Sequence, residues 1–193
     1  DGVPFESPSY NCSWMTELED VAEMLLLSGV NLWGEPRFQA LYQWPMQMLV
    51  CGTMTQPMGD SNNMFAGGLG VTPTYLERAY QRLGDPRMAR VMVQRGQPFR
   101  TDLFQKSMEE QVRAVAAQQP EDVGVSSQLL PALGYATLQN GSPAARFALA
   151  LFYGYYPGHA HYDRLNLEVY GYDHPLIPDL GYPETADGFD PRR

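Results

Sequence analysis

The sequence has little cysteine and no long apolar run, and each shortage excludes a class of protein. The two cysteines, Cys12 and Cys51, are too few for a disulfide framework and lie among apolar residues, which favours buried free thiols. No stretch approaches the roughly 20 apolar residues of a membrane-spanning helix. The chain begins Asp-Gly-Val-Pro, without an initiator Met or the basic and apolar start of a signal peptide. We therefore expect a mature or trimmed chain and no membrane partner.

Positive charge is also scarce. The chain has 13 Lys and Arg against 22 Asp and Glu, which gives a formal net charge of −9. This balance argues against nucleic acid and against an anionic membrane surface as partners. However, 12 of the 13 basic residues are Arg, and a guanidinium group can bind a carboxylate in a bidentate manner. The net charge opposes an anionic sugar substrate only mildly, because it does not describe a local cleft.

The residues that are plentiful indicate a packed globular protein. The chain has 193 residues, of which 44% are hydrophobic and 18% are charged, a composition that excludes disorder. Aromatic residues reach 12% and include 12 tyrosines. Tyrosine suits a surface that binds sugars, because its ring covers apolar sugar faces while its hydroxyl group stays hydrogen-bonded. Any single ring can equally belong to the core.

Helical signals dominate the first part of the chain. Apolar residues at helical spacing, with Pro near the starts and Gly after the ends, predict helices over residues 15–28, 37–51, 74–83, 86–94 and 103–117. We expect Pro45 to kink or divide the second of these helices. The stretch 53–70 is rich in Gly, Met, Asn and Pro and predicts a long loop, which in a compact domain is often functional.

Strand and turn signals replace the helical ones after about residue 122. Short aromatic or branched runs predict strands over residues 134–139, 146–155, 165–170 and 176–179, and Asn140-Gly141 predicts a hairpin. The predicted fold class is α+β, with a helical domain over residues 1–122 and a β domain over residues 123–193. We expect the β part to be the opening of a larger sheet.

All three histidines fall within sixteen positions, at His159, His161 and His174. On a strand, residues i and i+2 share one face about 6.5–7 Å apart, so His159, His161 and Asp163 would point the same way. Imidazoles and a carboxylate are the ligands that zinc prefers. The alternative is a pair of exposed turn histidines after Pro157. His174 precedes Pro175, and we expect a surface turn there.

Three segments carry a resemblance to a known family. The stretch 158–182, which begins Gly-His-Ala-His-Tyr-Asp and ends Asp-Leu-Gly-Tyr, resembles the signature of heparinase II/III-like and oligoalginate lyases. The start, Asp-Gly-Val-Pro-Phe-Glu-Ser-Pro-Ser-Tyr-Asn (1–11), is similar to that family's segment with a catalytic tyrosine. Pro-Met-Gly-Asp-Ser (57–61) resembles its loop between toroid helices. The order of the three segments along the chain also agrees.

The resemblance implies the C-terminal part of an (α/α) toroid followed by the beginning of an antiparallel β-sandwich. It implies that His159 contributes to acid/base catalysis with the phenol of Tyr10, and that His161 and Asp179 bind a zinc ion. A third zinc ligand, a later His, has no counterpart here, and we expect a fragment or trimmed chain. Lower-ranked candidates for substrate binding are Asn11 (where the family usually has His), Asp60, Asn62, Asn63, Arg146 and Tyr162.

The reaction implied is β-elimination on a uronic-acid-containing polysaccharide or oligosaccharide, in the periplasm or outside the cell. The proton on C5 is removed and the oxygen on C4 is expelled, which requires a base, an acid and neutralisation of the substrate carboxylate. We expect Tyr10 and His159 to face a common cleft between the helical and β parts. The alternatives are a zinc-dependent carbohydrate hydrolase and a non-catalytic carbohydrate-binding module.

Overall fold

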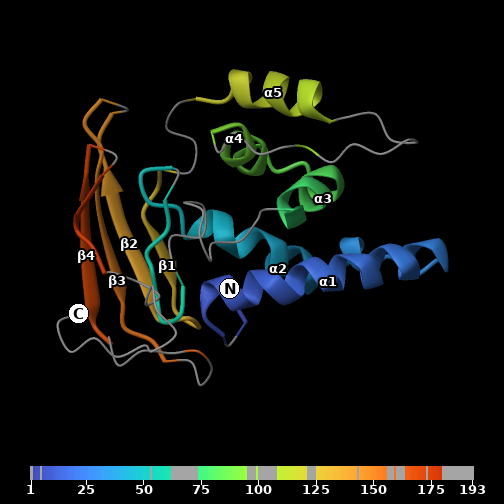
Figure 1. The fold of residues 1–193 in the computed structure, drawn as a ribbon, viewed down its shortest axis with the longest axis horizontal. Helices are drawn as coiled ribbons and strands as arrows, with labels where there is room; N and C mark the ends of the chain where they lie inside the picture. Colours follow the sequence, from blue (N-terminus) through green and yellow to red (C-terminus); the bar gives the residue numbers. More distant parts are fainter. Residues whose placement is uncertain are drawn as a thin grey trace, which may run out of the picture.

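The structure is a computed structural model with helices first and strands after them. It describes residues 2–4, 6–52, 54–61, 74–94, 99, 108–120, 125–142, 144–155, 159, 164–172 and 174–179. Within these residues the chain is mixed α/β, and the helices lie to one side of a five-stranded antiparallel sheet (Figure 1). This order of elements is the one that the sequence predicts.

All five predicted α-helices are present in the described part of the chain. Their bounds are α1 Pro8–Leu27, α2 Pro36–Gln47, α3 Thr74–Leu83, α4 Pro86–Gln94 and α5 Glu109–Gln118, with a short 3-10 helix, η1, at Leu32–Gly34. Pro45 does not divide the second helix, because it lies in the last turn of α2, which ends at Gln47 and not at the predicted residue 51. The predicted start of the fifth helix, residues 103–107, lies outside the described residues. None of the described helices is long and apolar enough to cross a membrane.

Helix α1 begins seven residues before the predicted start, because Pro8 occupies a first-turn position. Proline is favoured there, since the N–H group that it lacks would have no partner inside the helix. The helix ends as predicted before Gly29, where the N–H groups of Gly29 and Val30 donate to the carbonyl groups of Leu26 and Leu25. This pair of hydrogen bonds is the Schellman arrangement of a helix end.

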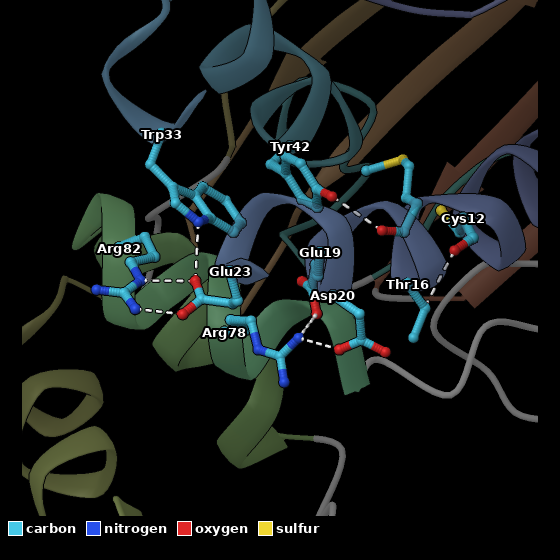
Figure 2. A network of polar contacts seen from close by, with 10 residues as sticks. Cys12, Thr16, Glu19, Asp20, Glu23, Trp33, Tyr42, Arg78 and Arg82 are labelled. Atoms are coloured by element: carbon cyan, nitrogen blue, oxygen red, sulfur yellow. Dashed lines mark hydrogen bonds and ion pairs between the residues drawn. The ribbon is translucent and has the colours of Figure 1, made fainter. Parts of the chain in front are cut away.

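Ion pairs join α1 to α3, and a hydrogen bond joins α1 to η1 (Figure 2). The guanidinium group of Arg82 binds both carboxylate oxygens of Glu23, and the indole N–H of Trp33 donates to Glu23 Oε1 at 2.9 Å. Arg78 forms a second pair with Asp20 at 2.5 Å. The hydrogen bonds from Arg82 are the main cause that lowers the pKa of Glu23, and they outweigh the raising effect of burial. These contacts join the second half of α1 to α3 and η1.

The sheet is an antiparallel meander of consecutive strands. Its strands are β1 Gln128–Leu130, β2 Tyr135–Asn140, β3 Phe147–Phe152, β4 Asn166–Gly171 and β5 His174–Ile177, in that spatial order. The predicted hairpin is confirmed, since Asn140 pairs with Phe147 across the loop that begins at Gly141. Strand β1 was not predicted, because three residues are too few for a visible alternation.

Both faces of the sheet carry apolar side chains, but among the residues that the structure describes only the inner face is covered. On the inner face Tyr135, Ala150 and Phe152 are buried, and the Tyr135 hydroxyl donates to the Met48 carbonyl group at 3.3 Å. The outer face carries large apolar side chains that are 40–65% exposed, namely those of Leu138, Phe147, Leu149 and Leu167. Strand β3 shows the alternation directly, with exposed and buried residues in turn over Phe147–Ala150.

Gly134 is a position where we expect alanine to be strongly destabilising. Its φ is +74°, and an added Cβ atom would lie 2.2 Å from the Cα atom of Gly154. Gly29 is a matched control, because its φ is +87° but an added Cβ atom meets nothing within 4 Å. Both alanine variants carry the backbone strain of about 1–2 kcal/mol, and Gly134→Ala adds the steric clash. Urea unfolding should show a clearly larger loss for Gly134→Ala, and equal losses would contradict the packing seen here.

Candidate active site

Two of the predicted catalytic residues lie in direct contact. Tyr10 is in the first turn of α1, and its ring stacks on the imidazole ring of His159. The ring centroids are 3.6 Å apart and the planes are inclined by 5°. The Tyr10 residue is 37% exposed and the His159 side chain is 44% exposed, so solvent reaches both. Residues that are far apart in the sequence thus present two protonatable groups at one place.

Glu6 binds the same histidine from the side. Its Oε2 atom lies 3.2 Å from Nδ1 of His159. Its Oε1 atom accepts hydrogen bonds from the backbone N–H groups of Ser7, at 2.7 Å, and of His159, at 2.8 Å. Burial raises the pKa of the Glu6 carboxyl group, but these hydrogen bonds and the contact with the imidazole outweigh burial and lower it overall. Glu6 is therefore held as a carboxylate against His159.

The loop over residues 57–61 supports both partners of the stack. The N–H group of Asp60 donates to the carbonyl group of His159 at 2.8 Å. The hydroxyl oxygen of Ser61 accepts a hydrogen bond from the N–H group of Ser9, beside Tyr10, at 2.8 Å. Ser9 and Ser61 are both buried. The loop therefore joins the start of α1 to the His159 segment, and it acts as a scaffold of the site.

Asp179, the predicted metal ligand, follows β5 and faces β4. Its Oδ2 atom accepts a hydrogen bond from the side chain of Asn166 at 3.0 Å. Glu168 is next to it, only 1% exposed, and accepts a hydrogen bond from the Tyr170 hydroxyl group. Burial and the charge of Asp179 raise the pKa of Glu168 to about 7, although hydrogen bonds from Tyr170, the Asp179 backbone and Gln56 oppose the shift. Two carboxylates thus share one small region.

Gln56 connects this carboxylate region to the Tyr10–His159 stack. Its side chain is buried, donates to the Asn166 carbonyl group at 3.3 Å and contacts Glu168. Gln56 and Asp60, which binds the His159 backbone, are four residues apart, so their Cα atoms are separated by at most about 14 Å. The segment over residues 56–60 therefore contacts the carboxylate region at one end and the His159 backbone at the other.

The lower-ranked candidates for substrate binding lie in different environments. Asn11 is fully buried, and its amide donates to the carbonyl groups of Glu6, at 2.8 Å, and Pro4, at 3.3 Å. Arg146 is 5% exposed and donates to the Cys51 carbonyl group at 3.1 Å. Asp60 contacts His159 through its backbone N–H group, which donates to the His159 carbonyl group. Three further candidates lie outside the described residues, namely Asn62, Asn63 and Tyr162.

The structure describes some of the predicted metal ligands, such as Asp179, but not all of them. His161 and Asp163 lie outside the described residues. The structure therefore tests neither the ligand set of His161 and Asp179 nor the set of His159, His161 and Asp163. Among the side chains that the structure does describe, no group of three or more His, Cys, Asp or Glu residues could hold a metal ion. His174 is the first residue of β5 and is exposed, at the surface as expected, although in a strand rather than a turn.

The C-terminal part of the chain matches a known family. Residues 123–193 match the family model described as "Heparinase II/III-like, C-terminal". This match is consistent with a heparinase II/III-like fragment, as the sequence motifs predict. A search of curated proteins found no match to the chain.

Sequence reasoning did not single out two carboxylates of this neighbourhood. Glu6 belongs to the Phe-Glu pair near the start of the chain, and Glu168 lies within the predicted strand over residues 165–170. A carboxylate in the middle of the apolar run Leu167–Tyr170 is a weak signal that the side chain has polar partners in the fold. Nothing local to Glu6 indicates that its partner is His159.

Proposed function

We propose that the chain belongs to a polysaccharide lyase that cleaves uronic-acid-containing glycans by β-elimination, with Tyr10 and His159 as the acid/base pair. The observation that carries the proposal is the stack of the two rings, 3.6 Å between centroids. The stack joins the start of the chain to the His159 segment, and hydrogen bonds connect both to the loop over residues 57–61. These are the three segments that resemble the lyase family. The family match over residues 123–193 supports this class of enzyme.

The chemistry requires two proton transfers on one sugar ring. A base takes the proton from C5, and an acid donates a proton to the oxygen that leaves C4. A phenol and an imidazole in contact can serve both positions, because a sugar ring above their common edge is only a few ångströms across. Histidine is suited to the task because its ordinary pKa lies near neutrality. The configuration at C5 decides which of the two groups is the base.

We further propose that His161 and Asp179 bind a zinc ion near this pair. Imidazole and carboxylate are donors that fit zinc. Burial and the charge of Asp179 raise the pKa of Glu168, and a cation beside the two carboxylates would offset their mutual repulsion. When bound, zinc would supply a fixed positive centre that holds the surrounding segment. Asp179 is kept in place for this by the hydrogen bond from Asn166.

The finer architecture is proposed as well: a segment of an (α/α) toroid over residues 1–122 and one layer of an antiparallel β-sandwich over residues 123–193. The apolar outer face of the sheet supports the sandwich, because a second sheet would cover such a face. We propose an anionic polysaccharide or oligosaccharide as the substrate, and the periplasm or the extracellular space as the location.

The product of the reaction tests the function. We expect the intact protein, incubated with alginate, a glycosaminoglycan, ulvan and a glucuronan in turn, to raise the near-ultraviolet absorbance with at least one of them. That absorbance comes from the unsaturated uronate that only elimination creates. The His159→Ala variant is the control and should give no rise. New reducing ends without absorbance would identify a hydrolase, and binding without any product would identify a carbohydrate-binding module.

A further inference from the structure

We propose that Glu6 is a positioning residue that fixes the orientation and the tautomer of His159, so that Nδ1 carries the proton and Nε2 is the working nitrogen. The effect of Glu6 on turnover rests on the proposed function, in which His159 is one of the acid/base pair. The effect of Glu6 on the tautomer of the imidazole ring does not rest on that function. The two consequences can therefore be measured separately.

The two carboxylate oxygens of Glu6 have different partners. Oε1 accepts two backbone hydrogen bonds, from Ser7 at 2.7 Å and from His159 at 2.8 Å. Oε2 is left to face Nδ1 of His159 at 3.2 Å. An ionised carboxylate can only accept hydrogen bonds, so it requires a proton on Nδ1. The lone pair of the neutral ring is then on Nε2, on the edge away from Nδ1.

Three contacts together restrict the histidine. Glu6 binds its Nδ1 edge, the Tyr10 ring covers one face, and the Asp60 N–H group holds its backbone carbonyl group at 2.8 Å. A ring held at its edge, its face and its backbone loses few further degrees of freedom when a substrate binds. Such preorganisation lowers the barrier of a proton transfer.

The contact is a poor candidate for a purely structural ion pair. The side chains of Glu6 and His159 are 24% and 44% exposed, and ion pairs that solvent reaches contribute little to stability. The backbone hydrogen bonds of Glu6 use only Oε1, which glutamine also has. The Glu6→Gln variant should therefore fold normally. Its only change should be that an amide NH₂ group replaces the carboxylate oxygen beside Nδ1 of His159.

The decisive experiment is ¹⁵N NMR of the intact protein labelled at its histidine side chains. With Glu6 present, His159 should show a protonated Nδ1 and an unprotonated Nε2 in its neutral form. In Glu6→Gln the amide oxygen stays with the two backbone N–H groups and the amide NH₂ group faces Nδ1, so the proton should move to Nε2. The His159→Gln spectrum assigns the signals, and Glu17→Gln, at an exposed position of α1, is the matched control. An unchanged His159 tautomer in Glu6→Gln would overturn the proposal.

Kinetics give the second measurement. In Glu6→Gln the proton is on Nε2, so this nitrogen no longer offers the lone pair that the wild-type ring has there. The variant should therefore lower kcat by about 10- to 1,000-fold and leave KM within about threefold, as expected for a residue that orients a catalytic imidazole. Glu6→Asp should restore part of the rate if it restores the Nδ1–H tautomer. Full turnover by His159→Ala would reject the proposed acid/base pair, while the NMR result would still decide the role of Glu6. A shifted tautomer with unchanged kcat would reject the catalytic consequence of Glu6.

Discussion

Tyr10→Phe is expected to lower the elimination rate of the intact enzyme by about 10²- to 10⁴-fold, the usual contribution of a positioned acid or base. Phenylalanine keeps the ring, so the stack on His159, with centroids 3.6 Å apart, should persist. Only the ionisable hydroxyl group is lost. Folding and much of the substrate affinity should therefore remain, because the hydroxyl group acts mainly in the transition state. The measurement is kcat and KM from the ultraviolet absorbance of the product.

The control for this variant is Tyr153→Phe, which makes the same chemical change at a tyrosine of similar exposure. Tyr153 is 40% exposed and Tyr10 is 37% exposed. We expect Tyr153→Phe to have normal kinetics. Near-normal turnover of Tyr10→Phe would remove the Tyr10 hydroxyl group from the mechanism, even with the ring stack intact.

His161→Ala is expected to lose most of the bound zinc and a large part of the thermal stability of the intact protein. A metal that binds only the folded state stabilises it by about 3 kcal/mol when free zinc is about 100 times its Kd. The zinc content after gel filtration and Tm by calorimetry are the measurements. Removing zinc from the wild-type protein with a chelator should lower Tm by the same amount and should not lower that of His161→Ala further.

The comparison with His159→Ala separates the two ligand sets. If His161 and Asp179 bind the metal, His159→Ala should keep its zinc, and so should the control His174→Ala, whose residue is exposed at the start of β5. Equal loss of zinc in His159→Ala and His161→Ala would favour the set of His159, His161 and Asp163 that strand periodicity indicates.

Local sequence signals predicted most of the secondary structure because each depends on neighbouring residues. Helices α3 and α4 have the predicted bounds, since Pro86 and Gly84 mark ends that hold in almost any context. The start of α1 was misplaced because its first turns, Pro8 to Trp14, carry polar residues among apolar ones. The first turn has partners far away in the sequence, such as Ser61, which accepts a hydrogen bond from the N–H group of Ser9, and no local pattern contains such a contact.

By itself the sequence determined the order of helices and strands, the resemblance of residues 123–193 to the heparinase II/III-like C-terminal family, and the choice of Tyr10 and His159 as candidate residues. Only the tertiary structure decided that their rings stack, and that Glu6 binds His159. The physical reason is that helix caps, turns and alternation act over a few residues, whereas a contact such as that from Glu6 to His159 depends on how separate elements pack. The loop that holds Asp60 against the His159 backbone is the element that brings these distant residues together.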